Sequence, residues 1–141
     1  MILPYRRYAE FDGRSRRMEF WMFTLFYYIV FFALFILMFA GLPWTEIMAA
    51  ENGQPIVSPP GPLFWFGFAV LMLFSLGSFV PMIAVTVRRF HDQDMSGWFY
   101  LLNLVPLGGL IVLVFMFLEG TKGPNQYGDD PKGAGAAGIF E

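Results

Sequence analysis

The sequence predicts an all-α protein, a small polytopic membrane bundle with three transmembrane spans, and three observations support this prediction. First, residues 20–45, 52–87 and 95–118 contain no charged side chain. Each stretch is longer than the roughly 20 residues that a helix needs to cross a hydrocarbon core about 30 Å thick. Second, the chain is 57% hydrophobic, with a mean hydropathy of +0.55, whereas soluble domains are about 45–50% apolar. Third, only 14% of the residues are charged, which is too few to cover a water-soluble globule.

The first segment, residues 1–18, is basic. Within it, apolar and charged residues alternate over 1–12. This pattern is typical of a short helix lying in the headgroup layer with its arginines near anionic phosphates. A frayed terminus is the alternative interpretation.

Span 1 is expected over 19–41. Ser15 is the expected N-cap, and Glu19 lies in the first turn, where the helix dipole favours a carboxylate and where it can reach Arg16. The helix is apolar on all sides, which indicates lipid contact all round. Because the apolar segment far exceeds the 7 to 15 residues of a signal-peptide core, we expect a retained anchor.

Span 2 is expected over 63–87, after the proline-rich residues 59–62, which favour the start of a helix. Span 3 is expected over 98–118, with Ser96 as N-cap. Its centre at 106–109 contains Pro106 and two glycines, which indicate either a helix kinked at Pro106 or the turn of a re-entrant hairpin. Broken backbone inside a membrane requires surrounding protein or water, so the kinked span is favoured.

The basic residues predict the orientation. Every arginine lies before span 1 or directly after span 2, whereas the loop 42–62 carries acidic residues and no Lys or Arg. The positive-inside rule therefore places the N-terminus and the polar loop 88–97 in the cytoplasm. An odd number of spans would then export the polar, glycine-rich tail 119–141. Within that tail, residues 132–138 are expected to be disordered because they are rich in Gly and Ala.

The composition also limits the function. The 141 residues leave room for a single membrane domain and no separate catalytic domain. The small net charge of -2 and the grouping of the basic residues do not suggest nucleic acid as a partner. Because the chain has no cysteine, disulfides and thiolate metal sites are excluded. We expect no cofactor and no metal.

The polar loop holds the only histidine, His91, close to Asp92 and Asp94. One hypothesis makes His91 a general base or metal ligand that an aspartate orients. The favoured alternative is a structural cluster of ion pairs with Arg88 and Arg89, in which the arginines also bind lipid phosphate. A single His without Cys is a poor basis for a zinc site.

Three separate motifs follow one another along the chain. They are Gly13, Arg14, Arg17, Glu19, Phe20 and Trp21; then Arg88, Arg89, His91, Asp92, Ser96, Gly97 and Trp98; and finally Gly120, Thr121, Gly123, Asn125, Tyr127, Gly128, Asp130 and Pro131. Together they resemble the motifs of a bacterial inner-membrane family, domain of unknown function 805. The resemblance implies a small helical inner-membrane protein and no established activity or cofactor.

The resemblance raises a topological question. If the tail motif acts with the two arginine motifs, all three must lie on one side of the membrane, which requires the re-entrant hairpin. In that case Asp129, Asp130 and Asn125 could complete a pocket with His91 and Asp92. If span 3 crosses, the tail acts alone outside.

The leading hypothesis is a non-enzymatic, multi-pass protein of the bacterial inner membrane that binds anionic lipid or a partner protein, as a homo-oligomer or with other membrane proteins. The candidate binding residues are Arg14, Arg16, Arg17, Arg88 and Arg89, and the candidate polar cluster is Glu19, His91, Asp92, Asp94, Asn125 and Asp130. A small oligomeric transporter or channel is one alternative, although the spans contain no acid or base. An interfacial enzyme using the His91 loop is the other.

Overall fold

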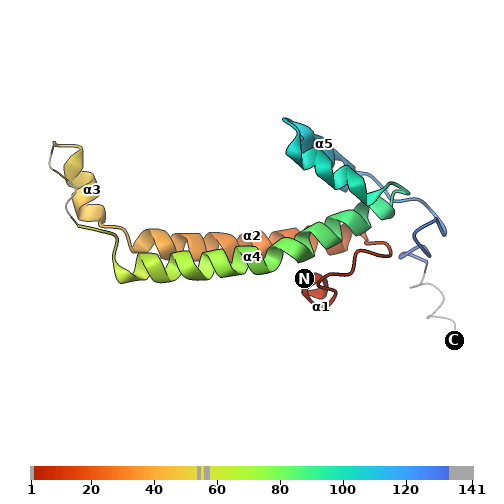
Figure 1. The fold of residues 1–141 in the computed structure, drawn as a ribbon, viewed down its shortest axis with the longest axis horizontal. Helices are drawn as coiled ribbons and strands as arrows, with labels where there is room; N and C mark the ends of the chain where they lie inside the picture. The colour runs from red at the N-terminus through yellow and green to blue at the C-terminus, as the bar shows by residue number, and fades with distance from the viewer. Residues whose placement is uncertain (1, 54, 56–57, 134–141) are drawn as a thin grey trace. The chain divides into compact units, whose positions relative to one another are not determined.

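The computed structural model describes residues 2–53, 55 and 58–133, and its regular elements in these ranges are helices. In chain order (Figure 1) they are α1 (Leu3–Arg6), α2 (Arg17–Ala40), α3 (Trp44–Ala50), α4 (Pro62–His91), the 3-10 helix η1 (Gly97–Leu104) and α5 (Gly108–Phe117). The chain forms two compact units. One combines Met1–Phe26 with Ser78–Glu141, and the other is Tyr27–Gly77. We call the first unit the cap.

The two expected long helices are present as α2 and α4, and both are long and apolar enough to cross a membrane. Only 11% of the most apolar window of α2 and 28% of that of α4 is buried. Such exposed apolar surface is unfavourable in water and is typical of a lipid-facing helix. Helix α4 continues beyond the predicted end at residue 87, so Arg88 and Arg89 lie in its last turn, where the helix dipole favours cations.

Within the unit Tyr27–Gly77, two glycines bring backbone segments close together. A Cβ on Gly41 would lie 2.1 Å from the Phe64 nitrogen, and one on Gly67 would lie 2.8 Å from Met38 Cα. Only glycine allows so close an approach, which is a common way for membrane helices to pack. The loop 42–62 also contains α3, which the sequence did not predict.

The segment expected to form span 3 is not a continuous helix. Its first half is η1 and its second half is α5, with a break in which Leu107 has φ of 64°. A Cβ on Gly108 would lie 1.8 Å from the Leu102 carbonyl oxygen, so the turn requires glycine there. Pro106 cannot donate the hydrogen bond that would continue the helix. Since η1 and α5 pack against each other, the segment is a helical hairpin, and the favoured prediction of a kinked span is wrong. The prediction of three spans is therefore met only in part.

The predicted helix N-cap at Ser96 is confirmed, because its hydroxyl accepts a hydrogen bond from the Trp98 nitrogen at 3.4 Å. One side of α5 then contributes to the core of the cap. That core consists of Phe20, Phe23, Val85, Phe90, Val112 and Met116.

The N-terminal segment contains a short helix, as one of the two interpretations expected. It packs inward as well, since the Tyr5 hydroxyl lies 2.6 Å from Ser78 Oγ and the Tyr5 ring meets Phe23 edge-on at 5.2 Å. Pro4 is buried. Helix α1 is therefore packed against other residues of the cap.

The tail up to residue 133 is a loop, with an isolated bridge between Asn125 and Gly128. Residues 134–138 of the stretch expected to be disordered lie outside the described residues.

Candidate functional site

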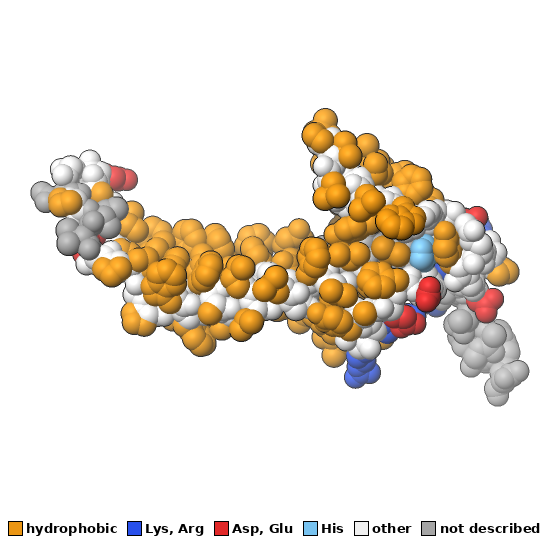
Figure 2. Space-filling view, viewed as in Figure 1, with side chains coloured by type: hydrophobic (Ala, Val, Ile, Leu, Met, Phe, Trp, Pro, Cys, Tyr) orange, Lys and Arg blue, Asp and Glu red, His pale blue; other side chains and the backbone are white. Residues whose placement is uncertain are grey.

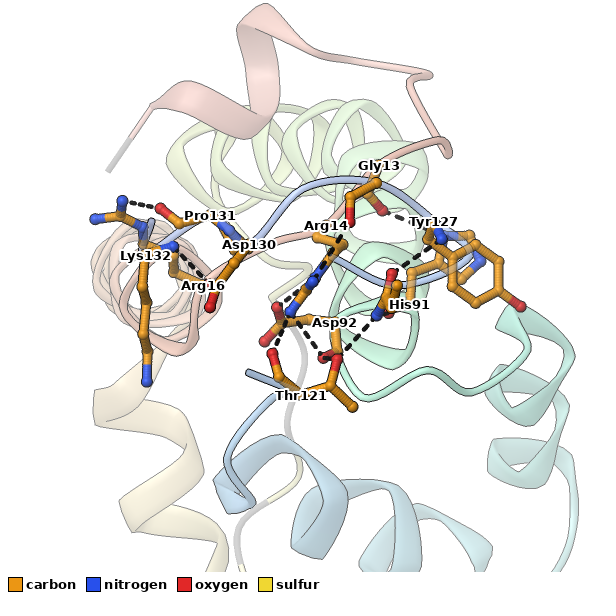
Figure 3. A network of polar contacts seen from close by, with 12 residues as sticks. Gly13, Arg14, Arg16, His91, Asp92, Thr121, Tyr127, Asp130, Pro131 and Lys132 are labelled. Atoms are coloured by element: carbon orange, nitrogen blue, oxygen red, sulfur yellow. Dashed lines mark hydrogen bonds and ion pairs between the residues drawn. The ribbon is translucent and has the colours of Figure 1, made fainter. Parts of the chain in front are cut away.

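The three motifs meet in the cap, where Asp92 lies among side chains from the N-terminal segment and the tail (Figure 3). We call Arg14, Glu19, Arg88, Arg89 and Asp92 the arginine cluster. Arg14 precedes α2, Glu19 lies in its first turn, and the other three lie at or just after the end of α4. The polar residues of three distant segments therefore form one site.

Asp92 is the central acceptor of the cluster. Its Oδ1 accepts a hydrogen bond from Arg14 Nε at 3.0 Å, and its Oδ2 accepts one from Arg89 Nη1 at 2.5 Å. The side chains of Arg14, Arg89 and Asp92 are 1%, 0% and 7% exposed. The Coulomb attraction within a pair so well shielded from water is stronger than at the surface, and removal of one partner leaves an uncompensated buried charge.

Backbone carbonyls of the tail and of Leu118, the residue before it, accept further hydrogen bonds from Arg14 and Arg89. Arg14 donates through Nη1 to the Gly123 oxygen and through Nη2 to the Thr121 oxygen, both at 2.6 Å. Arg89 Nη2 donates to the Leu118 oxygen. The Asp92 carbonyl in turn accepts from the Thr121 nitrogen at 2.8 Å. The tail is therefore bound to the cap by charge-assisted hydrogen bonds.

Gly120 is required where the tail passes Asp92. A Cβ there would lie 2.0 Å from Asp92 Oδ2 and 2.7 Å from the Asp92 carbonyl oxygen. Any other residue would push the tail away from the carboxylate.

Arg88 pairs with Glu19 at 3.4 Å, and the Arg88 side chain is completely buried. Its Nε and Nη1 atoms have no hydrogen-bond partner in the described structure. The predicted pairing of Glu19 with Arg16 is therefore wrong, because Arg16 extends to the Pro131 carbonyl instead. A folded α4 brings Arg88 to Glu19, a contact between residues distant in sequence.

The predicted N-cap at Ser15 is also wrong, because α2 begins at Arg17. Ser15 is buried, and its nitrogen donates to the Arg88 carbonyl at 3.1 Å. This bond joins the segment before α2 to the last turn of α4.

His91 is enclosed by backbone and aromatic groups. Its Nδ1 lies 3.3 Å from the Gly13 oxygen, and its ring stacks on Tyr127 with centroids 3.8 Å apart and planes 1° from parallel. The Asp92 carboxylate faces the arginines, and Asp94 is exposed. The structure does not bring His91 into an acid-base pair with either aspartate among the described residues.

The tail residues of the predicted polar cluster divide into two kinds. Asn125 joins the site, since its Nδ2 donates to the His91 carbonyl at 2.9 Å. Asp130 makes its hydrogen bonds within the tail, where it accepts from the Lys132 nitrogen at 2.8 Å and from the Gly123 nitrogen at 3.0 Å. These two backbone hydrogen bonds lower the pKa of Asp130, since they favour the ionised carboxylate.

The five arginines proposed for lipid or partner binding also separate. Arg14, Arg88 and Arg89 are buried, whereas Arg16 is exposed. Arg17 is partly exposed and pairs with the exposed Glu119 at 2.6 Å. The three buried arginines make their contacts inside the cap, so of these five only Arg16 and Arg17 reach its surface.

Sequence reasoning did not assign roles to Thr121, Tyr127 and Gly120, although all three lie in the tail motif. Their only signal in the sequence is the occurrence of that motif beside the other two. No group of three or more His, Asp or Glu side chains suited to a metal ion occurs within the residues described.

The fold and the site together define a small helical membrane protein in which polar residues of three distant segments meet in one cluster. The chain belongs to the family described as protein of unknown function DUF805, whose profile matches residues 8–129. It is 39% identical over 128 residues to the inner membrane protein YhaI of Escherichia coli K12, covering 90% of each chain. It is 37% identical over 128 residues to the inner membrane protein YhaH of the same strain, covering 90% of this chain and 91% of YhaH. No solved structure matches significantly.

Proposed function

We propose that the protein is a two-span inner-membrane protein with both termini in the cytoplasm, and that its cytoplasmic cap binds anionic phospholipid headgroups. One observation supports this most strongly. The tail is bound to the arginine cluster, so all nine Lys and Arg residues of the chain belong to the cap. The positive-inside rule favours a topology that keeps them together on the cytoplasmic side.

The hairpin of η1 and α5 fits this topology because it is too short to cross. The ten residues of α5 extend about 15 Å at 1.5 Å per residue, roughly half of the hydrocarbon thickness. Both ends of the hairpin are held near the end of α4, where Gln93 Nε2 donates to the Phe115 oxygen at 2.6 Å. Figure 2 shows the hydrophobic side chains that cover α5, and lipid tails are the environment that they favour.

Labelling of single cysteines tests the topology, since the natural chain has no cysteine. Asp12→Cys, Glu51→Cys and Lys122→Cys each alter an exposed residue. An impermeant maleimide added to spheroplasts should label only Glu51→Cys, and detergent should make all three reactive. Labelling of Lys122→Cys from outside would show that the third segment crosses.

Lipid binding is assigned to the exposed cations Arg6 and Arg16, since Arg17 is only partly exposed and is paired with Glu119. Each cation near an anionic surface contributes about 1 kcal/mol. Replacing both by Gln should therefore weaken binding of phosphatidylglycerol by about thirtyfold and leave binding of zwitterionic phosphatidylcholine unchanged. Equal binding of the two lipids by the wild type would refute the proposal. Association with itself or with other membrane proteins stays a prediction.

A further inference from the structure

A pocket of about 420 Å³ lies in the cap between α1, the first turns of α2 and the tail. We call it the N-terminal pocket. Its polar lining includes Arg7, Arg16 and Glu19, and its apolar lining includes Leu3, Met18 and Met22. The pocket therefore combines cations with an oily wall.

The charges around the pocket favour an anion. Glu10 accepts from Nε and Nη2 of Arg7 at 2.6 and 2.7 Å, which leaves Arg7 Nη1 for a further acceptor. Glu19 is already engaged by the buried Arg88. Arg16 uses Nη2 to bind the Pro131 carbonyl, and within the described part of the chain its Nη1 has no protein acceptor. Around the pocket and the arginine cluster, five guanidinium groups and Lys132 stand against the carboxylates of Glu10, Glu19, Asp92 and Asp130. This leaves an excess of positive charge.

The position of the pocket adds to this preference. Met18 and Glu19 belong to the first turn of α2, whose backbone N–H groups have no carbonyl partner within the helix. The positive end of the helix dipole therefore faces the same region as Arg16. In a protein that crosses the membrane through α2, this turn lies at the depth of the lipid phosphates.

The apolar wall distinguishes a lipid from a free ion. Met18 and Leu3 are 68% and 45% exposed, and a hydrated phosphate would gain nothing from them. A glycerol backbone and the first methylenes of an acyl chain would cover them favourably.

We infer that the N-terminal pocket binds the phosphate group of an anionic glycerophospholipid, with Arg16 and Arg7 on the phosphate oxygens and Met18 along the acyl chain. This inference rests on the proposed function and gives one location to a lipid that could otherwise associate with the whole charged surface.

The experiment compares Arg16→Lys with Arg17→Lys in the detergent-solubilised full chain. Both substitutions keep the net charge and alter neighbouring residues, but only Arg16 lines the pocket. A lysine cannot reproduce the planar fork of arginine on a phosphate. Native mass spectrometry with added phosphatidylglycerol should show about tenfold weaker binding for Arg16→Lys and no change for Arg17→Lys. Met18→Gln, which alters no charge, should also weaken binding.

Three other results would contradict the inference. If the wild type binds phosphatidylglycerol but Arg16→Lys, Arg17→Lys and Met18→Gln all bind it equally well, the charge acts diffusely and the pocket is refuted while the proposed function stands. If the wild type shows no preference over phosphatidylcholine, the proposed function fails as well. If millimolar inorganic phosphate displaces the lipid, the site recognises a free anion and the lipid assignment is refuted. Thermal unfolding of each variant verifies that it is folded.

Discussion

Replacing Asp92 by Asn should destabilise the cap strongly, because this carboxylate is the shared acceptor of two buried arginines. Its oxygens lie 3.0 Å from Arg14 Nε and 2.5 Å from Arg89 Nη1. An asparagine keeps one acceptor oxygen, loses the charge, and turns an NH₂ group toward a guanidinium. Removing one partner from a buried ion pair costs about 3–5 kcal/mol.

The matched control is Asp94→Asn, two residues further along the same loop. Asp94 is exposed and has φ of 58°, a left-handed conformation that Asn adopts readily. The same chemical change there should alter the free energy of unfolding by less than about 0.5 kcal/mol.

Thermal unfolding in detergent micelles measures the difference. At roughly 3 °C per kcal/mol for a chain of this size, Asp92→Asn should lower the melting temperature by about 10 °C or more. Trypsin should also cut faster at Lys122, since the tail loses its anchor. If the free energies of unfolding of Asp92→Asn and Asp94→Asn differ by less than about 0.5 kcal/mol, the arginine cluster does not hold the cap together.

Three further predictions concern the tail. Gly120→Ala should release the tail, because its Cβ would lie 2.0 Å from Asp92 Oδ2, and limited proteolysis should show faster cleavage with α2 and α4 still protected. Tyr127→Phe should keep the ring stack on His91, whereas Tyr127→Ala should lower the free energy of unfolding by about 0.5–1.5 kcal/mol. Equal melting temperatures of the two variants would contradict a role for the stack. The lowered pKa of Asp130 means that its stabilisation is fully present above its unfolded value of about 3.9 and is lost as the pH falls through the folded value. Asp130→Asn should remove that acid-dependent step from a pH titration of tail cleavage, and identical titrations of the two proteins would refute the assignment.

Arg88 and Arg89 form the ion pairs that the sequence favoured, and the structure adds that both are buried. Arg88 and Arg89 follow a long apolar run, which is the usual position of cations that meet lipid headgroups. In the structure α4 continues through both residues, and both are buried. Their acceptors are Glu19, Asp92 and the Leu118 carbonyl, so they join the ends of α2, α4 and α5 within the cap.

The hairpin illustrates a limit of sequence-based prediction. Pro106 and the glycines after it indicated a break, and two outcomes were compatible with that break. A kinked span leaves the tail outside, whereas a hairpin returns it to the arginines. The hairpin depends on contacts between residues that are distant in sequence. Arg14 binds carbonyls of the tail about a hundred positions away, and Arg89 binds the Leu118 carbonyl on the far side of the hairpin.

The amino-acid sequence was sufficient to predict the membrane location, the two long helices and the helix N-cap at Ser96. These features depend on the length of an uncharged run or on neighbouring residues, so they follow from local contributions that add along the chain. The return of the tail to the arginine cluster, the partner of Glu19 and the burial of three arginines required the folded structure. They depend on which distant charges meet in a medium of low dielectric constant, and only the packing of α2, α4 and the hairpin determines that.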